Sequence, residues 1–90
     1  MDNFIPLQGN TEDNLSKDEI LRFTFSANFA RFLVNQRKKL GLTQEELSKI
    51  SGVSRVTIAQ LERYQRLAGT EVLLKLLDAL NLDIQFIERE

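Results

Sequence analysis

The chain has 90 residues, lacks both cysteine and histidine, and carries a formal net charge of −1. This length supports one small domain with a modest core. The composition excludes disulfides, thiolate and imidazole metal sites and histidine-based catalysis, and no apolar run is long enough to span a membrane. The acidic start of the chain does not resemble a signal peptide. We therefore expect a cytoplasmic protein that is not an enzyme and holds no cofactor or metal.

Charge is distributed unevenly along the chain. Residues 1–19 hold five acids and one base, and residues 67–90 hold five acids and two bases, whereas residues 31–66 hold eight bases and three acids. A basic middle between acidic ends is expected if the middle contacts a polyanion. Because charges also scatter unevenly by chance in a short chain, the distribution alone leaves both interpretations open.

The N-terminal part divides into a tail and a helical extension. Residues 1–15 are polar and have no hydrophobic period, which predicts a flexible tail. Its apolar segment FIPL, residues 4–7, would contact either the surface of the domain or a partner. The sequence SKDE then forms a capping box that opens a predicted extension over residues 16–28. The alternation in RFTFS, residues 22–26, is also compatible with a short strand.

Two apolar stripes at helical spacing run through residues 20–33 and predict a wide apolar face. One stripe consists of Ile20, Phe23, Ala27, Ala30 and Leu33, and the other of Leu21, Phe25, Phe29 and Phe32. The helix is predicted to end at Leu40, because Gly41 supplies the cap.

A short helix is predicted to follow and to be cut off after about two turns. Thr43 and Glu46 form a second capping box, and the helix is expected to bury Leu47 and Ile50. Gly52 adopts a positive φ angle without steric cost, so the helix is expected to stop there.

A second short helix begins directly after this glycine turn. Ser54 is placed to cap it, and Ile58 and Leu61 are expected to be its buried residues. Two short helices joined by a turn that starts with glycine are typical of a helix-turn-helix.

The C-terminal part is predicted to contain one more helix and a strand. Thr70 is expected to cap a helix that ends near Asn81, with a core stripe of Val72, Leu73, Leu76, Leu77 and Leu80. In residues 82–90, Leu82, Ile84 and Phe86 alternate with polar residues, as in a half-buried strand. Because a lone strand in a helical domain needs a partner, we expect a homodimer in which these C-terminal strands pair.

The segment LVNQRKKLGLTQEELSKISGVSRVTIAQLE, residues 33–62, resembles the helix-turn-helix of the XRE/Cro–phage-repressor family. The resemblance covers roughly residues 29–80. It implies an all-α, lambda-repressor-like bundle of about five helices, with residues 29–81 as the DNA-binding domain. It also implies a transcriptional repressor that binds a palindromic operator in double-stranded DNA and associates with the nucleoid when bound.

The resemblance further implies roles for individual residues. Arg37 and Glu62 stand where the family has a structural ion pair. Arg55, Val56 and Gln60 stand where the family reads bases, and their chemistry suits guanine, a thymine methyl group and adenine respectively. Contacts to the DNA backbone are expected from Gln44, Ser54, Thr57, Lys38, Arg63 and Arg66.

The sequence departs from the family pattern after the second short helix. In ERYQRLAGTE, residues 62–71, Tyr64 replaces a common glycine, which would allow that helix to run longer.

Two further interpretations concern partners. The ending LLKLLDALNLDIQFIERE resembles that of HipB-type antitoxins, which implies an autoregulating antitoxin with a HipA-like kinase toxin as partner. A plain XRE-type regulator without a toxin is the alternative. A helix-turn-helix that serves only as a protein-interaction module, with the Phe-rich segment 20–32 as its contact surface, is a third.

Overall fold

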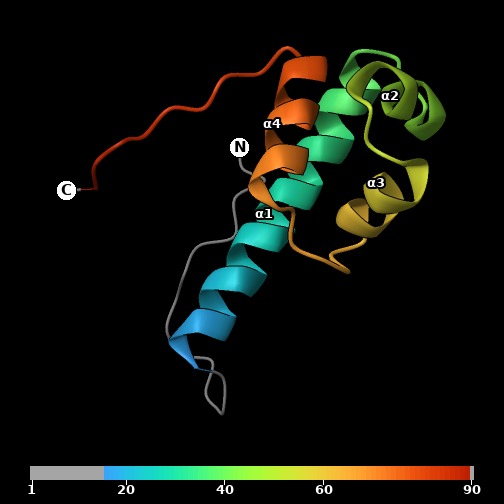
Figure 1. Ribbon diagram of the computed structural model, residues 1–90. Coiled ribbons are helices and arrows are strands. Elements are labelled where there is room, and N and C mark those ends of the chain that lie inside the picture. The colour runs from blue at the N-terminus through green and yellow to red at the C-terminus, as the bar shows by residue number, and fades with distance from the viewer. Residues whose placement is uncertain (1–15, 90) are drawn as a thin grey trace.

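The computed structural model describes residues 16–89, and in these residues the chain forms four helices. They are α1 (Lys17–Lys39), α2 (Gln44–Ser51), α3 (Arg55–Glu62) and α4 (Thr70–Ala79). Figure 1 shows α1 as the long axis, with the three shorter helices gathered around its C-terminal half. The expected all-α bundle with a helix-turn-helix is confirmed. The expected flexible tail and its FIPL segment lie outside the described residues.

The expectation of about five helices is wrong for the described part of the chain. The expected helical extension, residues 16–28, and the first helix of the expected DNA-binding domain form a single helix, α1. Neither glycine nor proline interrupts Lys17–Lys39, so α1 runs without a break through residues 28 and 29, where the extension was expected to meet the domain. The alternative of a short strand at RFTFS is also wrong, since residues 22–26 lie inside α1.

Both predicted capping boxes are formed. The Ser16 hydroxyl accepts a hydrogen bond from the Glu19 amide at 3.1 Å, and the Ser16 amide donates to the Glu19 carboxylate at 2.9 Å. Thr43 and Glu46 make the same pair of bonds at 3.0 and 2.9 Å. These bonds satisfy amide groups that a helix N-terminus otherwise leaves without a partner.

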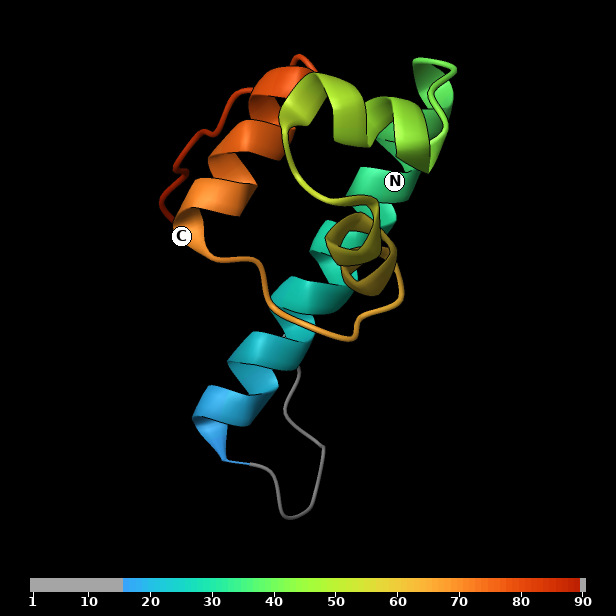
Figure 2. The same cartoon turned by 45° about the vertical axis from the view of Figure 1, so that its right-hand side comes forward.

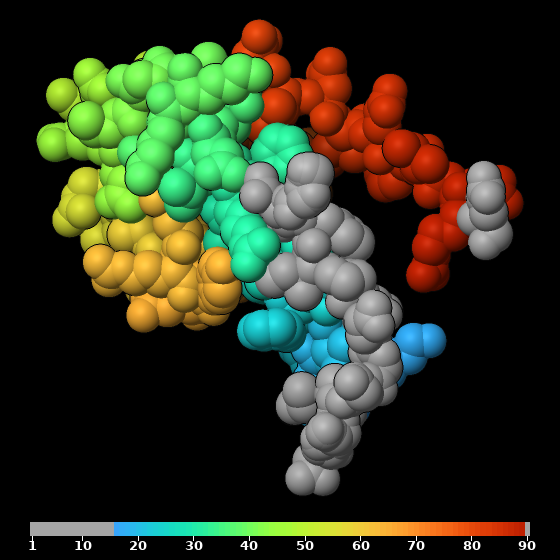
Figure 3. Space-filling view, turned by 180° about the vertical axis from the view of Figure 1, so that it is seen from behind, coloured from blue at the N-terminus to red at the C-terminus, as the bar shows by residue number. Residues whose placement is uncertain are grey.

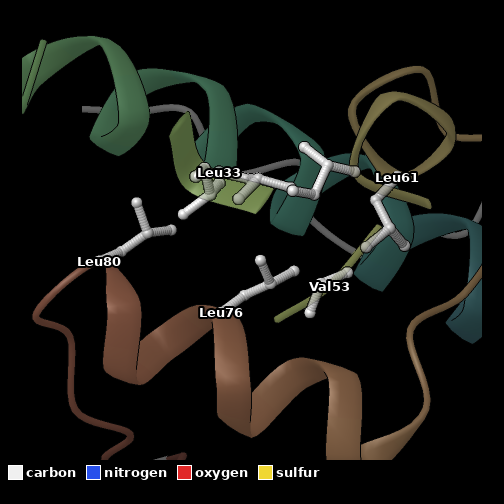
Figure 4. Close-up of a cluster of buried hydrophobic side chains, with 7 residues drawn as sticks. Leu33, Val53, Leu61, Leu76 and Leu80 are labelled. Atoms are coloured by element: carbon white, nitrogen blue, oxygen red, sulfur yellow. The ribbon is translucent and has the colours of Figure 1, made fainter. Parts of the chain in front are cut away.

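All four helices, together with the turn after α2, contribute to one hydrophobic core. Figure 4 shows Leu33 of α1, Leu61 of α3, Leu76 of α4 and Leu80 at the end of α4 pointing toward one another, with Val53 beside them. Burying a side chain of this size stabilises the fold by about 1.5–3 kcal/mol. The full cluster consists of Leu33, Leu47, Val53, Ile58, Leu61, Leu76 and Leu80.

Ile50 is exposed, so the expectation that α2 buries it is wrong. Leu47 is the residue of this two-turn helix that reaches the core, and Ile50 lies one turn later, near the end of the helix. Similarly, only Ala27, Ala30 and Leu33 of the α1 stripes are fully buried. The N-terminal half of the helix extends beyond the bundle, and Phe32, in the C-terminal half, is exposed.

Three helices end in the same kind of turn, with one residue in the left-handed conformation. After α1 this residue is Gly41 and after α4 it is Asn81, as the sequence predicted for both ends. After α3 it is Tyr64, with φ 66°. In each case the two amides that follow the cap donate back to carbonyl groups of the last helical turn, which is the Schellman arrangement.

The turn at Tyr64 ends α3 at Glu62, so the longer helix that the missing glycine suggested is not formed. The Tyr64 amide donates to the Leu61 carbonyl at 3.3 Å, and the Gln65 amide donates to the Gln60 carbonyl at 2.8 Å. These bonds stop the helix without a glycine.

Replacing Tyr64 with glycine is expected to stabilise the protein by about 0.5–1 kcal/mol. The substitution removes the about 1–2 kcal/mol that the left-handed conformation costs an L-residue, but it adds about 0.5–1 kcal/mol because glycine loses more chain entropy on folding. Urea denaturation followed by circular dichroism measures the difference. The control is Tyr64→Ala, which removes the ring but keeps the steric cost and should show no gain. Equal effects of glycine and alanine would contradict this explanation.

The helix α4 begins one residue earlier than predicted. Gly69 occupies the cap position and makes no side-chain hydrogen bond, while Thr70 is the first helical residue, so the expected Thr70 cap is wrong. Leu76 and Leu80 are buried, and the rest of the predicted α4 stripe is partly buried.

The predicted C-terminal strand is wrong for the chain described here. Residues 82–89 adopt no regular secondary structure, because a strand needs a ladder partner and residues 16–89 contain no other strand. Leu82 packs against the core of its own chain, whereas Ile84 and Phe86 are exposed. The segment leads away from the end of α4 (Figure 1). Within residues 16–89, none of the helices has the length and apolar character needed to cross a membrane.

Candidate nucleic-acid interface

The turn between α2 and α3 sets the position of α3. Gly52 adopts φ 80°, a left-handed conformation that glycine accepts without strain. Val53 is buried in the core, and its amide donates to the Ser51 hydroxyl at 3.1 Å. The turn thus directs α3 across α1, on a different side of α1 from α4 (Figures 1 and 2).

The inner face of α3 is fixed by two apolar residues. Ile58 and Leu61 are completely or almost completely buried. On the outer face, Arg55 and Val56 are exposed and Gln60 is partly exposed. The three predicted base-reading residues therefore lie on the outer face of α3, and the two buried residues that anchor the helix lie on its inner face.

The first turn of α3 holds two hydroxyl groups close together. The Ser54 hydroxyl caps the helix by accepting from the Thr57 amide at 3.1 Å, and it donates to the Thr57 hydroxyl at 2.9 Å. Because the two hydroxyls share a single hydrogen bond, one hydroxyl proton remains available for an external acceptor. A phosphate oxygen beside a helix N-terminus is such an acceptor.

Gln60 contacts a residue beyond the end of α3. The Arg66 guanidinium donates to the Gln60 side-chain oxygen at 3.4 Å, which brings a predicted backbone contact next to a predicted base reader. The Gln60 amide nitrogen has no partner in the described part of the chain, and its two protons remain available.

Glu62 connects the end of α3 to two other helices. The Arg37 Nε and Nη2 groups donate to its two carboxylate oxygens at 2.7 and 3.0 Å, so the structure brings the expected ion pair together in a two-bond geometry. Gln44 Nε2 donates to Glu62 at 2.9 Å, and Arg37 Nη1 donates to the Leu42 carbonyl at 2.8 Å. The side chains of Arg37 and Glu62 are only 12% and 7% exposed.

The contact between Gln44 and Glu62 was not foreseen from the sequence. Gln44 was expected only as a contact to the DNA backbone, yet one of its amide protons is used to hold Glu62. The sequence carried no signal for this contact, because it depends on how the first residue of α2 is placed against the end of α3.

The remaining predicted contacts are exposed cations. Lys38 lies in the last turn of α1, and Arg63 follows α3 directly. Neither forms an ion pair within residues 16–89, so both charges are available to an external anion. Residues 16–89 also contain no group of three acidic side chains placed to hold a metal ion.

Residues 33–87 match the sequence pattern of the helix-turn-helix family, and this match covers more than half of the chain. The chain therefore belongs to the helix-turn-helix family, and its resemblance to the XRE/Cro–phage-repressor group is confirmed. The match begins at Leu33, so the N-terminal half of α1 lies outside it.

Two known proteins are similar to this chain. The chain is 31% identical over 72 residues to an uncharacterized HTH-type transcriptional regulator of Haemophilus influenzae, covering 80% of this chain and 74% of that protein. It is also similar to the crystal structure of the restriction-modification controller protein C.AhdI from Aeromonas hydrophila. The identity is 36% and the TM-score 0.59, with 61% of this chain and 83% of that chain covered.

Proposed function

We propose that this protein is a transcriptional regulator that binds double-stranded DNA through the outer face of α3. The observation that carries the proposal is the mounting of α3, which is anchored by Ile58 and Leu61 and held at its end by Glu62. A rigid helix with an outward polar face fits the major groove. The names of both relatives, a transcriptional regulator and a controller protein, support this function.

Each residue of the outer face has a chemical role in the proposal. Arg55 binds guanine through two hydrogen bonds, Gln60 pairs with adenine, and the Val56 methyl groups contact a thymine methyl. The Thr57 hydroxyl proton and the second amide proton of Gln44 bind phosphate oxygens, as do Lys38, Arg63 and Arg66. Ser54, also predicted to contact the DNA backbone, holds the Thr57 hydroxyl in place through its own hydroxyl proton. The phosphate contacts fix the register of the helix, and the base contacts select the sequence.

The regulator is proposed to act as a homodimer that represses transcription from a palindromic operator, in the cytoplasm with the chromosome. Selection from a random duplex library is expected to enrich two inverted half-sites whose centres lie about one turn, 10–10.5 base pairs, or a multiple of this apart. A library that yields no enriched motif would contradict sequence-specific binding. A single half-site without its inverted copy would contradict the dimer.

A protein-interaction module is the second candidate function, because Phe23, Phe25 and Phe32 are all exposed on α1. Salt dependence separates the two functions. DNA binding should weaken steeply with the logarithm of salt concentration as counterions are released, whereas an apolar interface should respond little. Binding to a selected duplex that does not change between 50 and 200 mM salt, two concentrations chosen for the test, would argue against the DNA-binding function.

The antitoxin role is a narrower hypothesis within the same function. It rests on the likeness of the C-terminal residues to HipB-type antitoxins, and the strand that formed part of this likeness is not formed in residues 82–89. Affinity purification from the native host tests this role. A HipA-like kinase that co-purifies with the protein would support the antitoxin role. Promoter DNA recovered without such a kinase supports the plain regulator.

A further inference from the structure

An apolar groove lies between the N-terminal half of α1 and the loop that enters α4. Leu21 and Phe25 line one side and Leu67 and Leu73 the other, and Arg22 brings a positive charge to the lining. Its volume of 260 Å³ is below the about 300–1,000 Å³ typical of small-molecule sites. The groove therefore suits a few side chains of a polypeptide better than a cofactor.

The segment after α4 carries highly exposed apolar side chains. Phe86 is 95% exposed and Ile87 is 81% exposed. Figure 3 shows residues 84–89 standing clear of the helical body. Large apolar side chains presented in this way mark an interaction site, and the acidic residue Glu88 follows them directly.

We infer that residues 84–87 of one copy occupy the groove of a second copy, and that the second copy returns the contact. This inference rests on the proposed homodimer and specifies its surface. It replaces paired strands with an exchanged arm, so the exposed side chains of the arm are buried without a ladder of backbone hydrogen bonds.

Geometry favours a second copy over the chain's own groove. The groove lies at the start of α4, at Thr70 and Leu73, whereas the arm leaves after Leu82. The 10 residues of α4 separate these ends by about 15 Å at 1.5 Å per residue. The chain turns back after α4, and the arm descends beside α4 while standing clear of the helical body (Figures 1 and 3), so in this structure the arm does not occupy the groove of its own chain.

Charge and symmetry support the same arrangement. With Ile87 in the groove, the neighbouring Glu88 approaches Arg22 of the other copy. The ion pairs within residues 16–89 are Arg37 with Glu62 and Lys75 with Glu71, so neither Glu88 nor Arg22 is part of one. A two-fold axis makes both contacts identical. Because both arms are exchanged, the total surface buried is twice that of one arm, which is closer to the about 1,200–2,000 Å² that stable interfaces bury.

The exchanged arm leaves the DNA-binding face free. The lining of the groove comes from α1, the loop before α4 and α4 itself, and includes no residue of α3. Dimer formation and DNA binding can therefore be tested separately.

Cross-linking of single-cysteine variants tests the exchange, because the chain has no cysteine of its own. An Ile87→Cys variant is mixed with a Leu21→Cys variant and treated with a short bismaleimide. The matched control is Phe23→Cys, which is exposed on the same helix but lies outside the groove lining. A chain carrying both Ile87→Cys and Leu21→Cys tests closure within one molecule.

The expected result is a cross-linked heterodimer from Ile87→Cys with Leu21→Cys, at a yield at least several-fold above that with Phe23→Cys. Sedimentation should also show that Ile87→Asp raises the dimer dissociation constant by at least tenfold, while Phe23→Asp leaves it unchanged. A monomeric cross-link in the doubly substituted chain would overturn the exchange, because the arm then fills its own groove. Cross-links only between two Ile87→Cys chains would overturn it in favour of paired arms.

The outcome is distinguishable from failure of the proposed function. If the protein selects an inverted repeat but gives no heterodimer cross-link, the DNA-binding function stands and the exchange is wrong. If the cross-link forms but no duplex is bound, the exchange stands and the DNA-binding function is wrong.

Discussion

Replacement of Arg37 with alanine is expected to lower the free energy of unfolding by about 2–3 kcal/mol, below the roughly 3–5 kcal/mol lost when one partner of a fully buried ion pair is removed, because this pair is partly buried. The substitution removes both hydrogen bonds from Arg37 to the Glu62 carboxylate, whose remaining described partner is Gln44. It also removes the bond to the Leu42 carbonyl, which ties the end of α1 to the segment before α2. Urea denaturation measures the loss.

The matched control is Lys38→Ala, which removes the next cation of the same helical turn. Lys38 is exposed, so its removal should change stability by no more than about 0.5 kcal/mol. A double variant, Arg37→Met with Glu62→Leu, should lose less than the sum of its single variants, because no buried charge is left without a partner. Equal losses for Arg37→Ala and Lys38→Ala would contradict a structural role for the pair.

Replacement of Arg55 with alanine is expected to weaken binding to the selected operator by about 1–3 kcal/mol, or roughly 5- to 150-fold, and to relax the base preference at one position of each half-site. Arg55 is exposed at the start of α3 and forms no ion pair within the described residues. Its loss should therefore leave the fold unchanged. Fluorescence anisotropy with the operator and with random duplex DNA measures the effect.

The comparison with Lys38→Ala gives this prediction its control. A phosphate contact carries no sequence information, so Lys38→Ala should weaken operator and random DNA by the same factor and reduce the salt slope by about one. If Arg55→Ala weakens both DNAs equally, Arg55 contacts the backbone and does not read a base.

The sequence predicted most of the local structure because the relevant signals are local. Ser16 with Glu19 and Thr43 with Glu46 specify helix starts within four residues, and Gly52 specifies the turn. Tyr64 was not recognised as a helix end, because its left-handed conformation is imposed by the turn and not by its own preference.

Features that depend on the tertiary arrangement were harder to predict. Ile50 has the spacing of a core residue, but no element covers the end of α2 where it lies. Apolar and polar residues alternate over residues 82–86 whether the segment forms a strand or an unpaired arm. The segment becomes a strand only if a second strand pairs with it. The site shows the same limit, since the pairing of Arg37 with Glu62 followed from the family resemblance, whereas the contact of Gln44 with Glu62 required the structure.

The central claim is that the outer face of α3 contacts DNA, and chemical-shift mapping tests it most directly. The ¹⁵N-labelled protein is titrated with the selected duplex at moderate salt. The account predicts the largest shifts at the amides of residues 54–57 and 60 and at the Gln44 side chain, with little change at Phe25 or Leu73. Shifts concentrated at Leu21, Phe25 and residues 67–73, with α3 unaffected, would contradict it.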